Sequence, residues 1–147
     1  MSWDIRFLKL AKEVASWSKD PSTQVGSVAV NDLKQVISLG YNGMARGIRD
    51  DERLHDRELK YKMILHAEQN VLLNATQCLR HSTVYVWPFM PCSTCAAVLI
   101  QAGVTRVVSV KNDTERWQDS FKLTASLFAE AGVTLVLYPE EVLNAAG

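Results

Sequence analysis

The second half of the chain alternates between two hydrophobic patterns, and this alternation limits the possible folds more than any other feature of the sequence. Three short apolar runs predict strands, and the two segments between them carry apolar residues at helical spacing. Each predicted helix ends at a glycine, Gly103 or Gly132, as helices commonly do. The strands are expected at 83–87, 106–110 and 133–138, and the helices at 94–102 and 117–131. Strands joined through helices run parallel, with right-handed crossovers.

The first half of the chain predicts a helix followed by a hairpin. Ser2 is placed to cap a first helix, and apolar residues recur behind it at helical spacing. Two strand patterns, 24–30 and 35–40, are separated by the polar loop 31–34, which favours an antiparallel pair. The complete prediction is an α/β fold of three layers, α/β/α, around a five-stranded mixed sheet with an antiparallel first hairpin and parallel later strands. By its length, 1–147 is expected to be a single domain.

Composition narrows the classes of function. Hydrophobic residues make up 48% and charged residues 22%, and the formal net charge is zero, which disfavours a protein that holds long nucleic acid through phosphate contacts. The sequence shows neither an apolar run long enough to span a membrane nor a secretion signal at its start. Three cysteines are too few for a disulfide framework. We therefore expect a cytoplasmic protein with no membrane partner.

Residues 44–65 differ from the rest of the chain because charged side chains crowd them and few are apolar. This is a long connection for a compact domain, and long connections are often functional. Two interpretations stay open: a solvated, partly helical flap, or a contact with a ligand or another subunit.

Cysteine and histidine side chains at two predicted helix starts have the spacing of a metal site. Cys92 and Cys95 follow a proline at a strand-to-helix junction and project from one side of the first turn. His66, at the start of an earlier helix, can complete a three-ligand zinc site. Unpaired amides at a helix start favour thiolate, which is the form that binds metal. Three protein ligands leave a fourth position for water, which indicates a catalytic rather than a structural zinc.

Glu68 lies two residues after His66, a spacing that suits a base beside the metal better than a second ligand. Zinc lowers the pKa of bound water towards about 7 and so provides hydroxide at neutral pH. Hydroxide can attack the amidine carbon of an aminopyrimidine, while Glu68 moves a proton from water to the ring and later to the departing amine. Alone, each residue has a duller interpretation, such as a structural histidine or a glutamate that favours the helix dipole. Together they form the signature of zinc-dependent nucleobase deaminases.

Four other residues have less certain roles. Asn42 lies in a turn-forming run and is either a turn residue or part of the site. Trp87 and Phe89 either wall a bound base or belong to the core. Cys78, at the end of the predicted metal-site helix, is expected to be a buried free thiol. Because no further cysteine remains for a second site, we predict one zinc ion per chain.

Most of the chain resembles the deoxycytidylate (dCMP) deaminases of the cytidine deaminase superfamily. The matching segments are 18–26, 40–47, 66–68 and 91–96. The last two carry the zinc motif, which identifies the superfamily, whereas the Gly-Tyr-Asn-Gly-Met run at 40–44 and the charged insert after it select the nucleotide enzymes. The sequence departs from the family at Ala45, where proline is common, and at 111–114, where an aromatic residue often found after the fourth strand has no match.

The resemblance implies hydrolysis of dCMP to dUMP and ammonia, which supplies dUMP for dTTP synthesis. It also implies that Asn42 contacts the sugar. The substrate-binding candidates are therefore Asn42, Ala67 and Trp87. Family members are commonly homohexamers that dCTP activates and dTTP inhibits, with Mg²⁺ accompanying the triphosphate. The resemblance thus implies an oligomer, with the 44–65 insert near a subunit interface. The regulatory nucleotide site is expected at Gly43, Met44, Arg46 and Gly47, where an arginine on a glycine-flanked loop suits a phosphate.

Three other functions stay open. Within the superfamily, alternative substrates are cytidine, free cytosine and tRNA adenosine, although the neutral net charge disfavours tRNA. A Cys-x-x-Cys sequence after a strand is also the thioredoxin arrangement, but thiol redox chemistry leaves His66 and Glu68 without a role. A zinc-stabilised interaction module normally needs four protein ligands, and this sequence supplies three.

Overall fold

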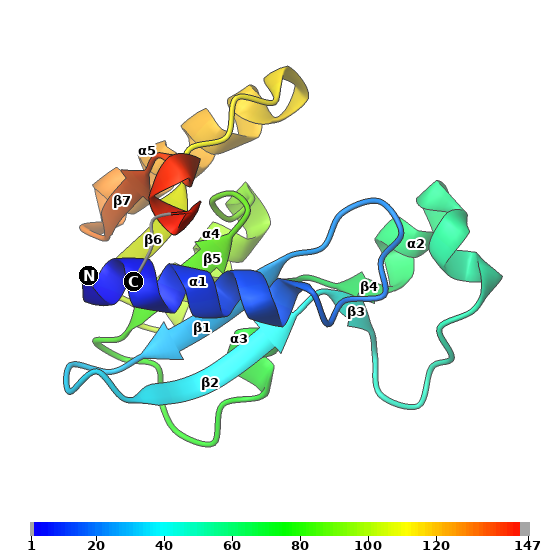
Figure 1. The fold of residues 1–147 in the computed structure, drawn as a ribbon, viewed down its shortest axis with the longest axis horizontal. Helices are drawn as coiled ribbons and strands as arrows, with labels where there is room; N and C mark the ends of the chain where they lie inside the picture. The colour runs from blue at the N-terminus through cyan, green and yellow to red at the C-terminus, as the bar shows by residue number, and fades with distance from the viewer. Residues whose placement is uncertain (1, 145–147) are drawn as a thin grey trace.

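A mixed five-stranded sheet forms the centre of the computed structural model, which describes residues 2–144 (Figure 1). The strands are β1 (Gly26–Val30), β2 (Val36–Tyr41), β5 (Thr83–Trp87), β6 (Arg106–Val110) and β7 (Thr134–Tyr138). Their order across the sheet is β2-β1-β5-β6-β7. β1 pairs antiparallel with β2 and with β5, whereas β5–β6 and β6–β7 are parallel. The predicted sheet, with its antiparallel hairpin and parallel later strands, is confirmed.

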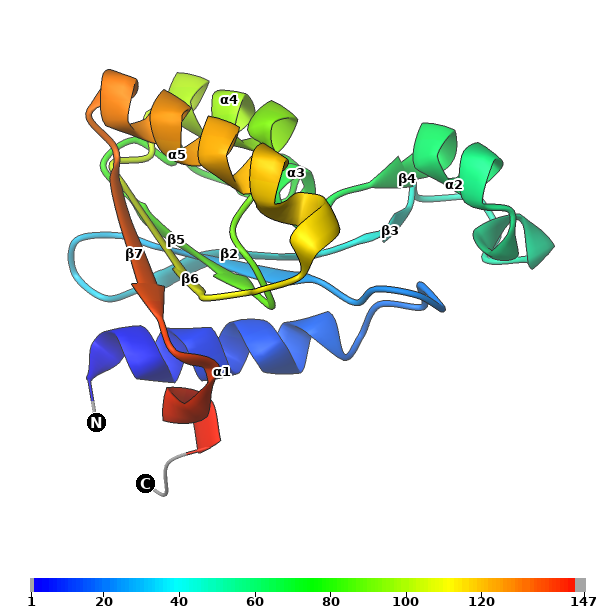
Figure 2. The same ribbon diagram turned by 90° about the horizontal axis from the view of Figure 1, so that it is seen from above.

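Helices cover both faces of the sheet, which confirms the three-layer prediction (Figure 2). One face carries α1 (Trp3–Ala15), and the other carries α3 (Ala67–Leu73), α4 (Ser93–Gln101) and α5 (Gln118–Ala131). Short 3-10 helices lie at Glu115–Trp117, before α5, and at Glu140–Asn144, after β7. Within residues 2–144, no helix combines the length and apolar character needed to cross a membrane.

The helix that follows β5 starts one residue earlier than the sequence predicted. Cys92 has an extended backbone and is the N-cap, and its carbonyl accepts a hydrogen bond from the Ala96 amide at 2.8 Å. Ser93, expected outside the helix, is therefore its first residue. At the other end Gly103 adopts a left-handed φ of 88°, as a glycine that terminates a helix commonly does.

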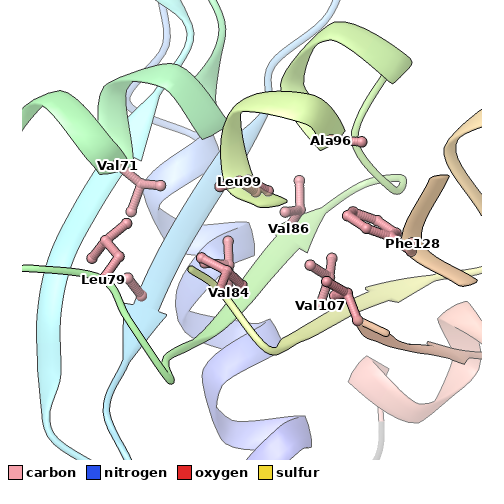
Figure 3. Packing of buried hydrophobic residues seen from close by; sticks show 11 residues of the cluster. Val71, Leu79, Val84, Val86, Ala96, Leu99, Val107 and Phe128 are labelled. Carbon is pink, nitrogen blue, oxygen red and sulfur yellow. The ribbon is translucent and has the colours of Figure 1, made fainter. Parts of the chain in front are cut away.

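An apolar core fills the space between the sheet and the layer of α3, α4 and α5 (Figure 3). Val86 and Val107 of the sheet point towards Leu99 of α4 and Phe128 of α5, and all four side chains are at most 1% exposed. Burial of one such side chain stabilises the fold by about 1.5 to 3 kcal/mol. This core therefore holds α4, whose first turn carries both cysteines of the predicted metal site, firmly on the sheet.

Two glycines let helices approach the sheet at backbone distance. A Cβ atom at Gly40 would lie 2.6 Å from the Ala67 carbonyl oxygen and 2.4 Å from the Val71 amide nitrogen, both on α3. A Cβ atom at Gly26 would lie 2.0 Å from the Ala11 carbonyl oxygen on α1. Because packed elements cannot yield by that much without moving, a larger residue at either position would push the helix away from its strand.

A partly buried carboxylate joins the first helix to the parallel strands. Asp4 accepts two hydrogen bonds from the Arg106 guanidinium, at 2.8 and 2.6 Å. It also accepts one from the Tyr85 hydroxyl at 2.8 Å and one from the Tyr138 hydroxyl at 2.7 Å. The hydrogen bonds from Arg106, followed by those from the two tyrosines, outweigh desolvation and hold the pKa of Asp4 well below its ordinary value.

This network predicts acid sensitivity. A carboxyl whose pKa is lowered by folding stabilises the protein above its unfolded pKa, about 3.9, and loses that contribution as pH falls through the folded value. We expect Asp4→Asn to lower the free energy of unfolding by about 2 kcal/mol at neutral pH. Below about pH 4 the difference from the parent protein should shrink, since the unfolded parent chain then binds a proton at Asp4 that the folded chain does not. Urea denaturation at several pH values measures this, and a difference that stays constant down to about pH 2 would contradict it.

The charged segment between β2 and α3 leaves the sheet as a separate excursion (Figure 1). It starts with β3 (Gly43–Met44) and ends with β4 (Ile64–Leu65), and these two-residue strands pair antiparallel. Between them lie a 3-10 helix, Glu52–His55, and α2 (Arg57–Met63). The prediction that this segment is partly helical is therefore confirmed, and one of its side chains, described below, reaches the candidate site.

Candidate active site

The start of helix α3 places His66 and Glu68, two residues apart, beside the sheet. His66 is its N-cap, and the His66 amide donates a hydrogen bond to Gln69 Oε1 at 2.8 Å. The close approach at Gly40 is reinforced by side chains that bridge α3 and β2. Ser38 Oγ donates to the Val71 carbonyl at 2.6 Å, Asn70 Nδ2 to the Tyr41 carbonyl at 2.8 Å, and Asn74 Nδ2 to the Leu39 carbonyl at 3.0 Å. These contacts between α3 and β2 therefore fix the position of His66 relative to the sheet.

The three predicted metal ligands come together, and their spacing fits zinc. His66 Nδ1 lies 3.3 Å from Cys95 Sγ and 3.7 Å from Cys92 Sγ, and all three ligand atoms lie within 4.8 Å of one another. Zinc bonds of about 2.0 Å to nitrogen and about 2.3 Å to sulfur place tetrahedral ligand atoms about 3.5 to 3.8 Å apart. One nitrogen and two sulfur ligands are also a donor set that zinc prefers. These residues therefore fit a zinc ion in both chemistry and separation.

The two cysteines have opposite electrostatic environments. Hydrogen bonds from Cys95 and then from His66 lower the pKa of Cys92 to about 4, despite its partial burial. The same contact with Cys92, together with burial, raises the pKa of Cys95, and the contact with Cys92 also raises the pKa of His66. One thiolate is therefore favoured by the protein alone. A divalent cation between the two sulfurs would favour the second, because a coordinating thiol is deprotonated.

Glu68 is a buried carboxyl next to this cluster. Glu68 is 5% exposed, and its carboxyl contacts Cys95. Desolvation raises the pKa of Glu68 to about 7, although the positive charge of His66 opposes the shift. A carboxyl with a pKa near neutrality both accepts and returns protons under physiological conditions, which is the property required of a general acid–base.

A cavity of ≈ 230 Å³ opens beside these residues. Five predicted site residues line it: Asn42, His66, Ala67, Glu68 and Cys92. A concave, mostly apolar cavity with a few polar groups and a perturbed carboxyl is the usual form of an active site.

Asn42 also organises the loop that forms one wall of this cavity. Its Oδ1 accepts from the Val25 amide at 2.9 Å, and its Nδ2 donates to the Thr23 carbonyl at 2.8 Å. The Asn42 carbonyl accepts from Ser18 Oγ at 2.8 Å. The sequence assigned residues 24 and 25 to the first strand, which instead starts at Gly26, because these contacts wrap 18–25 around the asparagine. Its predicted contact with a sugar stays a prediction.

The two aromatic candidates lie on different faces of the sheet. Trp87 packs with the α1 layer, where its Nε1 donates to Glu140 at 3.1 Å, and it is not among the cavity-lining residues of the described chain. Phe89 lines the cavity and stacks on Trp117, with ring centroids 4.5 Å apart. Phe121 meets both rings edge-on. Trp117, which sequence periodicity placed only at the start of a helix, thus provides an aromatic wall that we had not predicted.

Two charged residues of the cavity were also missed. Asp20 and Lys60 line it and form an ion pair, with Lys60 Nζ 3.1 Å from Asp20 Oδ1. The residues are 40 positions apart in sequence, and only their buried positions distinguish them from the many surface charges. The sequence-level signal was weak: Asp20 precedes a proline, and Lys60 is one of many charges in the insert.

The expected regulatory residues lie at the base of the excursion. Gly43 and Met44 form β3, and Gly47 has a left-handed φ of 84°. Arg46 Nη2 donates to Asn74 Oδ1 at 3.0 Å, which attaches this loop to the end of α3. Their role with a nucleotide stays a prediction.

The expectation for Cys78 was wrong, because this thiol is exposed rather than buried. Helix α3 ends at Leu73, so Cys78 belongs to the loop that follows. There the neighbouring Leu79, 1% exposed, takes the buried position. Cys78 is not part of the described His/Cys/Cys cluster.

Comparisons with known proteins identify the family. A statistical model of the cytidine and deoxycytidylate deaminase zinc-binding region matches residues 1–111. An "uncharacterized deaminase in luxG 3'region" of Aliivibrio fischeri is 38% identical over 145 residues, which cover 97% of each chain. The deoxycytidylate deaminase of Mus musculus is 37% identical over 143 residues, covering 91% of this chain and 78% of that protein.

Solved structures share the fold at lower sequence identity. The dCMP deaminase of the cyanophage S-TIM5, crystallised with dCMP and dUMP, aligns with a TM-score of 0.74 at 23% identity, covering 93% of this chain and 98% of the other. A structure from a study of tRNA:A34 deaminases aligns with a TM-score of 0.57 at 22% identity, covering 95% of this chain and 94% of the other. From the matched zinc-binding region and these relatives, the chain belongs to the cytidine and deoxycytidylate deaminase family.

Proposed function

We propose that this protein is a zinc-dependent deaminase that hydrolyses dCMP to dUMP and ammonia. The observation that carries the proposal is the buried Glu68 carboxyl, which shares a cavity with His66 and Cys92 and contacts Cys95. Relatives named deoxycytidylate deaminase, at 36% to 37% identity over 143 residues in the mouse and human proteins, support the choice of dCMP. The product dUMP would supply dTTP synthesis.

His66, Cys92 and Cys95 would hold the zinc ion, one per chain. When bound there, zinc supplies Lewis acidity that lowers the pKa of a coordinated water towards about 7. Glu68 takes one proton from the attacking water and gives it to the ring nitrogen of cytosine as the C–O bond forms at C4. It then takes the remaining hydroxyl proton and gives it to the amine as the C–N bond breaks, which leaves a C4 carbonyl, so water and dCMP yield dUMP and ammonia.

The cavity walls contribute orientation and exclusion of water. Ala67 is fully buried and lines the cavity between the histidine and the glutamate. Phe89 and Trp117 present stacked aromatic rings to the same cavity, which suits a planar base. Asn42 is anchored through its own carbonyl and side chain, so a ligand that contacts it meets a fixed group.

A substrate panel tests the proposal. The zinc-loaded protein should deaminate dCMP with a kcat/KM at least about 10-fold above that for cytidine, deoxycytidine or a tRNA anticodon stem, because contacts to a phosphate discriminate by at least that factor. Removal of the metal by a chelator should abolish turnover, and added zinc should restore it. Faster deamination of tRNA adenosine would overturn the choice of substrate. A metal-free protein with a reversible Cys92–Cys95 disulfide would support thiol redox chemistry instead.

Activation by dCTP, inhibition by dTTP, Mg²⁺ bound with the triphosphate and a hexameric assembly are further parts of this proposal. Their support is the resemblance at Gly43, Met44, Arg46 and Gly47 and the position of these residues on one loop. Arg46, already held by Asn74, lies at the junction of the excursion with α3. A nucleotide bound at this loop would therefore lie next to α3, the helix that carries Glu68.

A further inference from the structure

The excursion between β2 and α3 places one cationic side chain, that of Lys60, in the wall of the candidate active-site cavity. Lys60, on the second turn of α2, is 5% exposed, whereas its helix neighbours Leu59 and Tyr61 are 37% and 63% exposed. Lysine is rarely buried to this extent unless it is paired. Lys60 lines the cavity that also contains His66 and Glu68. Of the cavity-lining residues within 2–144, it is the sole lysine or arginine.

The ammonium group is held by a fixed set of partners. Lys60 Nζ donates to Asp20 Oδ1 at 3.1 Å and to Ser22 Oγ at 2.7 Å. Asp20 in turn accepts hydrogen bonds from the Ser22 amide and hydroxyl, both at 2.9 Å, and from the Thr23 amide at 3.1 Å. Burial alone would raise the pKa of Asp20, but these bonds and Lys60 together lower it, so the carboxylate keeps its charge.

Lys60 has one donor left for a ligand. An ammonium group has three N–H donors, and its hydrogen bonds to Asp20 and Ser22 use two of them, while the Tyr61 ring centroid lies 5.8 Å from Nζ. Asp20 accepts four hydrogen bonds that do not involve lysine, the fourth from Asn42 Nδ2 at 3.5 Å, so the carboxylate does not depend on the ammonium alone. The carboxylate and the hydroxyl fix the ammonium at the cavity wall and remove most of its rotamer freedom before any ligand arrives.

Neutral donors line the same cavity as Lys60. Thr23, Tyr61 and Ser120 line the same cavity and each carries a hydroxyl. The Tyr61 hydroxyl accepts from Arg57 Nε at 3.1 Å, so its own proton is free to be donated. A cation among hydroxyl donors is the chemistry that binds phosphate oxygens. No comparable set of donors is needed for a cytosine ring and an uncharged sugar.

We propose that Lys60 binds the 5'-phosphate of the substrate and so makes the cavity selective for a nucleotide over the corresponding nucleoside. The proposal rests on the function proposed above, since Lys60 would be the group that binds the phosphate of dCMP. Asp20 and Ser22 act as positioning residues for Lys60. The excursion thus supplies specificity, while the zinc-binding residues and Glu68 supply the chemistry.

The test compares two substrates that differ only in the phosphate. In the zinc-loaded parent enzyme, kcat/KM is measured for dCMP and for deoxycytidine. Lys60→Met should lower kcat/KM for dCMP about 30-fold, the size expected for one charge-assisted hydrogen bond, and change that for deoxycytidine less than about 3-fold. The ratio of the two values therefore falls about 10-fold or more. Lys62→Met, which removes an exposed lysine from the same helix, should leave the ratio unchanged.

A paired variant protects the test against unfolding. Lys60→Met leaves the Asp20 charge buried without its cation, whereas Asp20→Asn with Lys60→Met removes both charges. The paired variant should show the same loss of the dCMP to deoxycytidine ratio, and deoxycytidine turnover reports that the site is intact. Equal losses for both substrates in each variant would make Lys60 a structural residue and overturn the inference. A parent enzyme that deaminates both substrates equally would also overturn it, while leaving deamination itself in place. A parent that deaminates neither would remove the proposed function and this inference together.

Discussion

Replacement of Glu68 by glutamine is expected to leave the metal bound and to lower kcat for dCMP by about 10³-fold. Glutamine has nearly the same shape but cannot exchange protons, and general acid–base catalysis is worth about 10² to 10⁴ in rate. The effect is expected in kcat rather than KM, because the proton moves during the chemical step and not during binding. Steady-state kinetics, with zinc content determined on the same sample, measures both quantities.

The glutamine variant also separates catalysis from folding. Glu68 is buried with a raised pKa, so neutral glutamine removes a group that is costly to ionise there, and stability should be equal to or above that of the parent. Glu68→Ala should likewise keep the metal and lose turnover. A glutamine variant that deaminates dCMP at the parent rate would remove Glu68 from the mechanism.

Replacement of Cys95 by serine is expected to abolish metal binding. Cys95 is buried, is one of the two proposed sulfur ligands, and lies 3.3 Å from His66 Nδ1. A serine hydroxyl does not ionise at neutral pH and is a poorer zinc ligand than a thiolate. Zinc content after dialysis should fall from one ion per chain to below about 0.1, because the site needs each of its ligands to hold the metal. Turnover of dCMP should then fall by at least about 10³-fold.

Cys78→Ser provides the matched control for this prediction. The same substitution at an exposed cysteine outside the ligand cluster should leave one zinc ion per chain and full activity. Two zinc ions in the parent protein, or loss of metal from the Cys78 variant, would contradict a single three-ligand site.

The sequence predicted what local patterns encode. The apolar runs at 83–87 and 106–110 correspond to β5 and β6 residue for residue, since a buried strand bounded by turn residues has a clear signal. The cluster of His66, Cys92 and Cys95 was predictable because each half of the motif lies within four residues of sequence and at a helix start. Packing then brings the two halves together, which the order of strands and helices already required.

Contacts between distant segments could not be read in this way. β5 is buried on both faces, so no alternation shows that Val86 faces the catalytic layer and Trp87 the α1 layer. Trp87 was therefore placed near the site when it lies on the opposite face. The Asp20–Lys60 pair was missed for a related reason, because its partners come from a loop and from the charged excursion. Charge in a sequence does not reveal which lysine is buried.

The short ladder between β3 and β4 closes the excursion into a loop of its own. Because the ladder brings the two ends of the excursion together before His66, changes of length within residues 45–63 alter the entropy of one closed loop and leave the zinc-binding and acid–base residues where they are. Lineages that exchange this loop would alter which molecules the enzyme accepts while inheriting its reaction unchanged. Engineering of new substrate preferences in this scaffold should therefore start with α2 and not with the sheet.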